Sequence, residues 1–157
     1  KECFEFIEAI EPTFTSAHMM KAGCLFNMEQ WDEAFTIYKS LLDEDKDSYT
    51  LLYYCGRCLY EQGYYNEALT YLTHSREMLM LDPDVPQELY TELYFIMASC
   101  YYRNGNTDNA RTFLYEGLAI DPDDEDLREL AVRILPEDEA SMFTDESTPR
   151  NGIITTI

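Results

Sequence analysis

The chain has 157 residues, 46% of them hydrophobic and 14% aromatic, so it is long and apolar enough to bury a core. Its 31 acidic and 11 basic residues give a net charge of −20, which argues against nucleic acid and anionic membrane surfaces as partners, because both are bound through Lys and Arg. No apolar run of about 18 residues occurs, so we expect no membrane-spanning helix.

Apolar residues recur at spacings of three and four along the chain and predict an all-helical fold. A first helix over 2–10 ends at Pro12. Three helix pairs follow, over 15–28 and 31–43, over 48–62 and 65–81, and over 87–103 and 107–119. Glu29-Gln30, Gly63 and Asn104-Gly105-Asn106 are the expected turns within the pairs. A last helix over 124–135 stops before Pro136.

The remaining residues, 136–157, are rich in Asp, Glu, Ser and Thr and end in the apolar run 153–157. We expect most of this acidic tail to lack regular structure, because it offers little apolar surface to offset the ordering of its backbone. Its Ile-rich end is expected to pack into an apolar groove of the same or a neighbouring molecule.

A similar four-residue motif occurs three times, as Trp-Asp-Glu-Ala, Tyr-Asn-Glu-Ala and Thr-Asp-Asn-Ala. The alanines of the first two copies, Ala34 and Ala68, lie 34 residues apart. The third, Ala110, lies 42 further on, which is one more period with eight residues inserted around 78–86. An alanine that recurs at this period after a turn indicates stacked helix pairs.

These residues resemble the tetratricopeptide repeat family over about residues 1–135. The second copy carries Leu52, Gly56, Leu59, Tyr65, Ala68 and Leu72 at the family's positions, and the third carries Tyr94, Ala98, Tyr101, Gly105, Ala110, Leu114 and Pro122. The resemblance implies an all-α, right-handed solenoid: a half-repeat over 1–14, repeats over about 15–47, 48–86 and 87–122, and a capping helix over 124–135. Ala22, Gly56 and Ala98 are expected to lie opposite Ala34, Ala68 and Ala110, where larger side chains would force the helices apart.

The resemblance also implies a binding site, because the first helix of each pair lines the concave face in this family. The positions carried over are Met19, Gly23, Phe26, Asn27, Tyr53, Arg57, Tyr60, Glu61, Phe95, Ser99, Tyr102 and Arg103. Tyr, Phe, Met and Arg are enriched in binding hot spots. Met19 and Gly23 replace the polar residues of members that clamp carboxylates, which argues against such a clamp here.

The expected function is therefore that of a non-catalytic module that binds a protein or peptide segment in an aromatic groove and belongs to a larger scaffold protein. Two alternatives stay open, a chaperone for an aggregation-prone client and a self-assembling module that pairs through the N-terminal half-repeat or the tail. The start at Lys1 without Met predicts that the chain is a piece of a longer protein.

No catalytic, cofactor or metal motif is evident. Cys55 and Cys58 form a C-x-x-C pair, but zinc would need a second pair of ligands, and a redox pair would need a βαβ context. His18 and His74 have no ligand or catalytic companion at a fitting spacing. The five cysteines are odd in number and lie in apolar helical patterns, which favours free thiols and a cytoplasmic location, with the bacterial periplasm left open.

Overall fold

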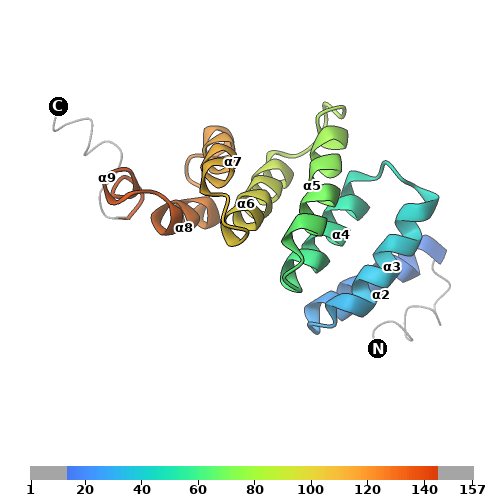
Figure 1. Ribbon diagram of the computed structural model, residues 1–157. Coiled ribbons are helices and arrows are strands. Elements are labelled where there is room, and N and C mark those ends of the chain that lie inside the picture. The colour runs from blue at the N-terminus through green and yellow to red at the C-terminus, as the bar shows by residue number, and fades with distance from the viewer. Residues whose placement is uncertain (1–13, 145–157) are drawn as a thin grey trace. The chain divides into compact units, whose positions relative to one another are not determined.

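The computed structural model describes residues 14–144, and every regular element within them is a helix (Figure 1). In chain order the helices are α2 (Phe14–Asn27), α3 (Trp31–Glu44), α4 (Tyr49–Glu61), α5 (Tyr65–Leu79), α6 (Gln87–Arg103), α7 (Thr107–Ile120), α8 (Glu125–Ile134) and α9 (Glu137–Ala140). The predicted all-α fold is confirmed. The predicted helix over 2–10 and the Ile-rich end lie outside the described residues. Over 14–144, no helix is both long and apolar enough to cross a membrane.

The chain divides into two compact units, Lys1–Val85 (unit 1) and Pro86–Ile157 (unit 2). The division falls at the end of the inserted segment that the sequence places between the second and third repeats. Within unit 1, α2 packs on α3, α3 on α4, and α4 on α5. Within unit 2, α6 packs on α7, both pack on α8, and α8 packs on α9. Each unit is therefore a series of neighbouring helices and is described by itself.

The turn within each helix pair has the same backbone geometry. Gly63 and Gly105 have φ values of +88° and +82°, and Glu29 occupies the corresponding place with φ of +61°. After each of these residues a backbone N–H bonds a carbonyl five residues back, as from Tyr64 to Leu59 at 2.9 Å. This is the Schellman arrangement, in which a left-handed residue ends a helix and satisfies its last carbonyls. The hinges expected at Gly63 and Gly105 are thus present.

Small residues set the distance between paired helices. A Cβ added to Gly56 on α4 would lie 2.6 Å from Cγ of Leu72 and 3.2 Å from the carbonyl oxygen of Ala68, both on α5. Ala22, Ala34, Ala68, Ala98 and Ala110 are all fully buried. The close approach that the sequence predicts at Gly56 and Ala68 is therefore observed. Gly117 on α7 has a comparable role, because its Cβ would lie 2.9 Å from Leu127 on α8.

The start of the acidic tail forms a short helix that the sequence analysis did not predict. Pro136 precedes α9, Ala140 is buried, and Phe143 packs against the core of unit 2. Arg111 on α7 donates two hydrogen bonds from Nη2 to the carboxylate of Glu139, at 2.7 and 2.9 Å. Residues 137–143 therefore cover the end of the helical stack. A four-residue helix is too short for apolar periodicity to reveal it.

Candidate binding site

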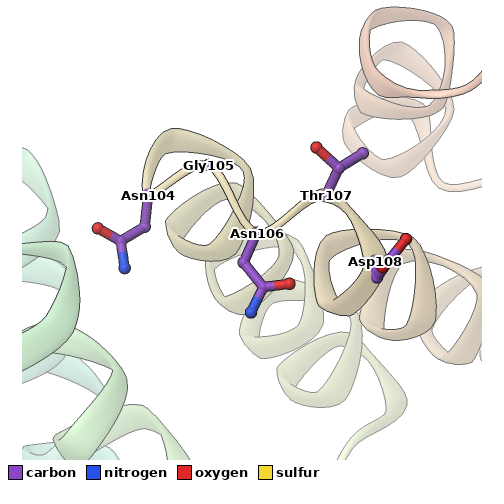
Figure 2. Close-up of a pocket in the computed structure, with 5 residues that line it drawn as sticks. All are labelled: Asn104, Gly105, Asn106, Thr107 and Asp108. Atoms are coloured by element: carbon purple, nitrogen blue, oxygen red, sulfur yellow. The ribbon is translucent and has the colours of Figure 1, made fainter.

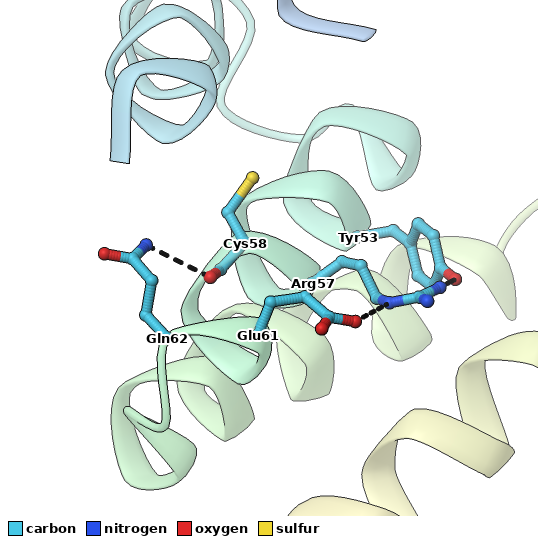
Figure 3. Close-up of polar contacts among 5 residues, drawn as sticks. All are labelled: Tyr53, Arg57, Cys58, Glu61 and Gln62. Atoms are coloured by element: carbon cyan, nitrogen blue, oxygen red, sulfur yellow. Dashed lines mark hydrogen bonds and ion pairs between the residues drawn. The ribbon is translucent and has the colours of Figure 1, made fainter. Parts of the chain in front are cut away.

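Arg57 is the centre of a polar and aromatic cluster on unit 1. Its Nε donates to Oε1 of Glu61 at 3.2 Å, and its Nη1 donates to the Tyr53 hydroxyl at 3.2 Å (Figure 3). Tyr53, Arg57 and Glu61 lie four residues apart, so one face of α4 carries all three. The guanidinium also lies over the ring of Phe26 on α2, 5.6 Å from its centroid. We call these four residues the Arg57 cluster.

The Arg57 guanidinium is oriented before any ligand arrives. Partial burial disfavours its charge, but the Tyr53 hydroxyl and the Glu61 carboxylate outweigh that effect and raise the pKa of Arg57 above its ordinary value. Two of its five N–H donors are used in these bonds. Among residues 14–144, the other three donors form no hydrogen bond. The cluster can therefore hold a carbonyl or carboxylate oxygen without rearranging the side chain.

The other predicted positions of unit 1 have surroundings of their own. Tyr60 makes an edge-on contact with Tyr65, with ring centroids 5.7 Å apart. Met19 is half-buried and packs against the core. Asn27 is exposed at the end of α2. Of the positions carried over in unit 1, the structure brings Phe26, Tyr53 and Glu61 into direct contact with Arg57.

In unit 2 the predicted positions differ in accessibility. Phe95 and Tyr102 are half-buried and pack against the core of the unit, and Arg103 is exposed at the end of α6. Ser99 is only 4% exposed and offers almost no surface to a partner. The family resemblance placed Ser99 on the binding face, but α6 packs against both α7 and α8, so more of its surface is covered than in a helix with one neighbour.

A small cavity lies where α6 meets α8. Its volume is about 60 Å³, and it is lined by Phe95, Asp126, Glu129, Leu130 and Arg133. Arg133 Nη2 donates to Oε1 of Glu129 at 2.9 Å. The sequence predicted α8 only as a capping helix, and the four cavity residues that α8 contributes were not predicted. The signal was present, since Leu127, Leu130, Ala131 and Ile134 repeat the spacing of a first helix.

A second, open hollow lies at the turn between α6 and α7, lined by residues 104–108 (Figure 2). Its polar groups already have a structural role, because Oδ1 of Asn106 accepts a hydrogen bond from the backbone N–H of Asn109 at 3.2 Å and caps α7. Gly105 supplies the left-handed turn. The arrangement is that of a capped helix start.

The cysteines of the C-x-x-C pair are buried and inert. Cys55 and Cys58 are free thiols with no exposed surface, and burial raises the pKa of each to about 12. Cys100 has the same properties. A thiol with such a pKa is a poor nucleophile and metal ligand at neutral pH. Among residues 14–144, no three His, Cys, Asp or Glu side chains are placed to hold a metal.

One cysteine departs from the expectation that all are free thiols. Cys24 on α2 is disulfide-bonded, and none of Cys55, Cys58 and Cys100 is its partner. The argument for a reducing compartment from free cysteines therefore applies to those three alone.

Family models match both units by sequence. A model described as subunit 3 of the anaphase-promoting complex, or cyclosome, matches residues 3–75. A tetratricopeptide repeat model matches residues 91–134. Among curated proteins, none matches the chain significantly.

Several solved structures share the fold at low sequence identity. The secretion chaperone SycD of Yersinia enterocolitica, in complex with a peptide of the translocator YopD, is 15% identical with a TM-score of 0.64, over 85% of this chain and 95% of that one. A MamA RS-1 double mutant is 14% identical with a TM-score of 0.69, over 89% and 75%. YrrB, described as a TPR protein with an unusual peptide-binding site, is 16% identical with a TM-score of 0.64, over 81% and 63%. At these identities the likeness is one of fold.

Proposed function

The chain is a tetratricopeptide repeat protein, and we propose that it is a non-catalytic module that binds an extended or helical segment of a partner protein. The segment would lie on the faces of the first helices of unit 1, where Phe26, Tyr53, Arg57 and Tyr60 offer aromatic and cationic surface. The observation that carries the proposal is the Arg57 cluster, in which a charged guanidinium is oriented by groups from two helices.

The chemistry of this cluster suits a peptide. Aromatic surface from Phe26 and Tyr53 would bury apolar side chains, and the remaining N–H donors of Arg57 would bond a main-chain carbonyl or an acidic side chain. Because three neighbours already restrict the Arg57 side chain, little additional rotamer entropy is lost on binding. Glu61 keeps the local net charge near zero, so a neutral carbonyl is a better match than a second carboxylate.

The test is affinity capture from the source cells with the wild-type chain and with Arg57→Gln and Tyr60→Ala, followed by mass spectrometry. Tyr64→Ala is the matched control, because Tyr64 is 54% exposed and lies in the turn after α4. We expect a partner that is captured by the wild type and by Tyr64→Ala but lost with the other two variants. An unchanged set of captured proteins with Arg57→Gln and Tyr60→Ala would refute the assignment.

A chaperone role is the second candidate, and one observation favours it. The match to SycD spans 95% of that chain, so the two have a similar extent of helical repeat. A chaperone would keep one aggregation-prone client soluble when the two are co-expressed. If every captured partner is equally soluble without this chain, the chaperone role is excluded.

Two further proposals concern assembly and place. We propose that the chain acts in the cytoplasm as part of a larger scaffold, supported by the family of the first model, which is a subunit of a complex. Self-association through the N-terminal half-repeat or the tail is the alternative. Light scattering over a hundredfold range of concentration tests self-association, since a constant monomer mass eliminates it. Imaging of the tagged protein tests the cytoplasmic location.

A further inference from the structure

The cavity between α6 and α8 lies within one compact unit and joins apolar and acidic groups. Phe95 on α6 and Leu130 on α8 supply its apolar walls, and Asp126 and Glu129 bring two carboxylates to it. Arg133 is the fifth lining residue and is paired with Glu129 at 2.9 Å. The lining therefore carries one more negative than positive charge. Glu129 is paired with Arg133, and Asp126 is the additional carboxylate.

The surrounding surface has the same sign. Residues 86–144 contain 13 acidic and four basic side chains, and none of the four is Lys. Three of the arginines pair with carboxylates of the unit, Arg111 with Glu139, Arg128 with Asp123 and Arg133 with Glu129. The field around the cavity is therefore negative and attracts a cation.

A side chain that fits this cavity needs an apolar stem and a compact cationic head. Lysine has both, since its methylene chain packs on apolar surface while the ammonium remains at the polar edge. The face of the Phe95 ring also attracts a cation, through the ring quadrupole. With a volume of about 60 Å³, the cavity suits a compact ammonium better than a planar guanidinium.

We propose that this cavity is a subsite for a lysine side chain of a peptide segment bound on unit 2. The stem would lie against Phe95 and Leu130, and the ammonium would lie at Asp126 and Glu129. This inference rests on the proposed peptide-binding function and gives it a sequence requirement, a basic residue where the segment crosses α6 and α8.

The probe for the test is Nα-acetyl-lysine amide, titrated into the ¹⁵N-labelled chain at low salt, with Nα-acetyl-norleucine amide as the uncharged isostere. We expect saturable shifts of the amide signals of Phe95, Asp126 and Glu129 with the lysine probe. We expect weaker binding by norleucine amide and by Nα-acetyl-arginine amide, and weaker lysine binding at high salt. Equal responses to lysine and norleucine, or no saturable shift at these three amides, would overturn the proposal.

Asp126→Asn tests the named carboxylate, and Asp138→Asn on α9 is the control with the same change of charge. We expect the first to weaken lysine binding about twofold to fivefold, the range of an exposed ion pair, and the second to leave it unchanged. Equal weakening by both would mean attraction to the overall charge and would refute a specific subsite. Since the probe is a single amino acid, a failure here is distinct from a failure to capture a partner through Arg57 and Tyr60.

Discussion

Unit 1 and unit 2 are built from the same helix pair but present different polar chemistry on their first helices. In unit 1 a guanidinium is held between aromatic side chains, with Glu61 as its counterion. In unit 2, α8 brings two carboxylates to the cavity that it forms with Phe95 of α6. The residues between paired helices must be small in both units, whereas the residues on the open face can vary. Packing therefore fixes the scaffold and leaves the binding chemistry to a few positions.

The two units also differ in their buried acids, and this difference predicts the largest effect. Unit 1 buries Cys55 and Cys58, and unit 2 buries Cys100, each with a pKa of about 12 against a reference of 9.0. Below pH 9 these thiols are protonated in both the folded and unfolded states. Between pH 9 and 12 only the unfolded state ionises, so stability falls by about 1.4 kcal/mol per pH unit for each thiol.

From pH 8 to pH 10 we therefore expect the thiols to lower the stability of unit 1 by about 3 kcal/mol and that of unit 2 by about 1 kcal/mol. Trp31, the single tryptophan, reports unit 1 in urea unfolding, and amide hydrogen exchange of α6 and α7 reports unit 2. Cys55→Ala should halve the decrease seen by Trp31, and Cys100→Ala should leave it unchanged. A decrease of the same size in all three proteins would contradict the burial argument.

Gly56→Ala should destabilise unit 1 by about 1–3 kcal/mol, because the new methyl would overlap Leu72 and approach the backbone of Ala68. Gly117→Ala should cost unit 2 somewhat less, since the new methyl would lie 2.9 Å from the movable end of Leu127 and 3.0 Å from Cβ of Tyr94, against 2.6 Å from Leu72 for Gly56. Urea unfolding monitored as above measures both. The control is Gly23→Ala, whose methyl would meet, among residues 14–144, only the Tyr38 hydroxyl, at 3.9 Å. It should be neutral or stabilising, as alanine usually is in a helix.

Glu139→Gln tests the covered end of unit 2, which unit 1 lacks among its described residues. The change removes the charge that Arg111 binds with two hydrogen bonds and that the Tyr115 hydroxyl also contacts. We expect a loss of about 0.5–1 kcal/mol, modest because the pair is partly exposed, together with faster amide exchange in α9 and no change in the Trp31 transition. Equal protection of α9 in the two proteins would mean that Ala140 and Phe143 hold it alone.

Glu29→Gly should have the smallest effect and the opposite sign. Glu29 has a φ of +61°, at the turn position that glycine occupies elsewhere in both units, and a left-handed conformation costs a residue with a Cβ about 1 kcal/mol. Part of that gain is lost to the greater freedom of glycine in the unfolded chain, so we expect unit 1 to gain about 0.5 kcal/mol in thermal unfolding. Gly63→Ala, the reverse change in the next pair, should destabilise it.

Much of the fold could be predicted because its signals are local. Apolar spacing located seven of the described helices, with ends within two residues of those observed, and Gly63 and Gly105 marked turns that need a positive φ. The candidate site was harder to predict from the sequence. The spacing of Tyr53, Arg57 and Glu61 places them on one face of a helix, but their contact with Phe26 spans two helices. Ser99 was predicted to face a partner, but its side chain is almost fully buried.

The sequence by itself determined the helix pairs, their turns, the close approach at Gly56 and Ala68, and the strong negative charge. Each of these depends on residues that are near in sequence or on a repeating period. Only the tertiary structure decided that Arg57 meets Phe26, that α8 joins Phe95 in forming a cavity, and that α9 covers the end of unit 2. These contacts join residues from different helices, and a pattern within one helix carries no information on what the neighbouring helix presents to it.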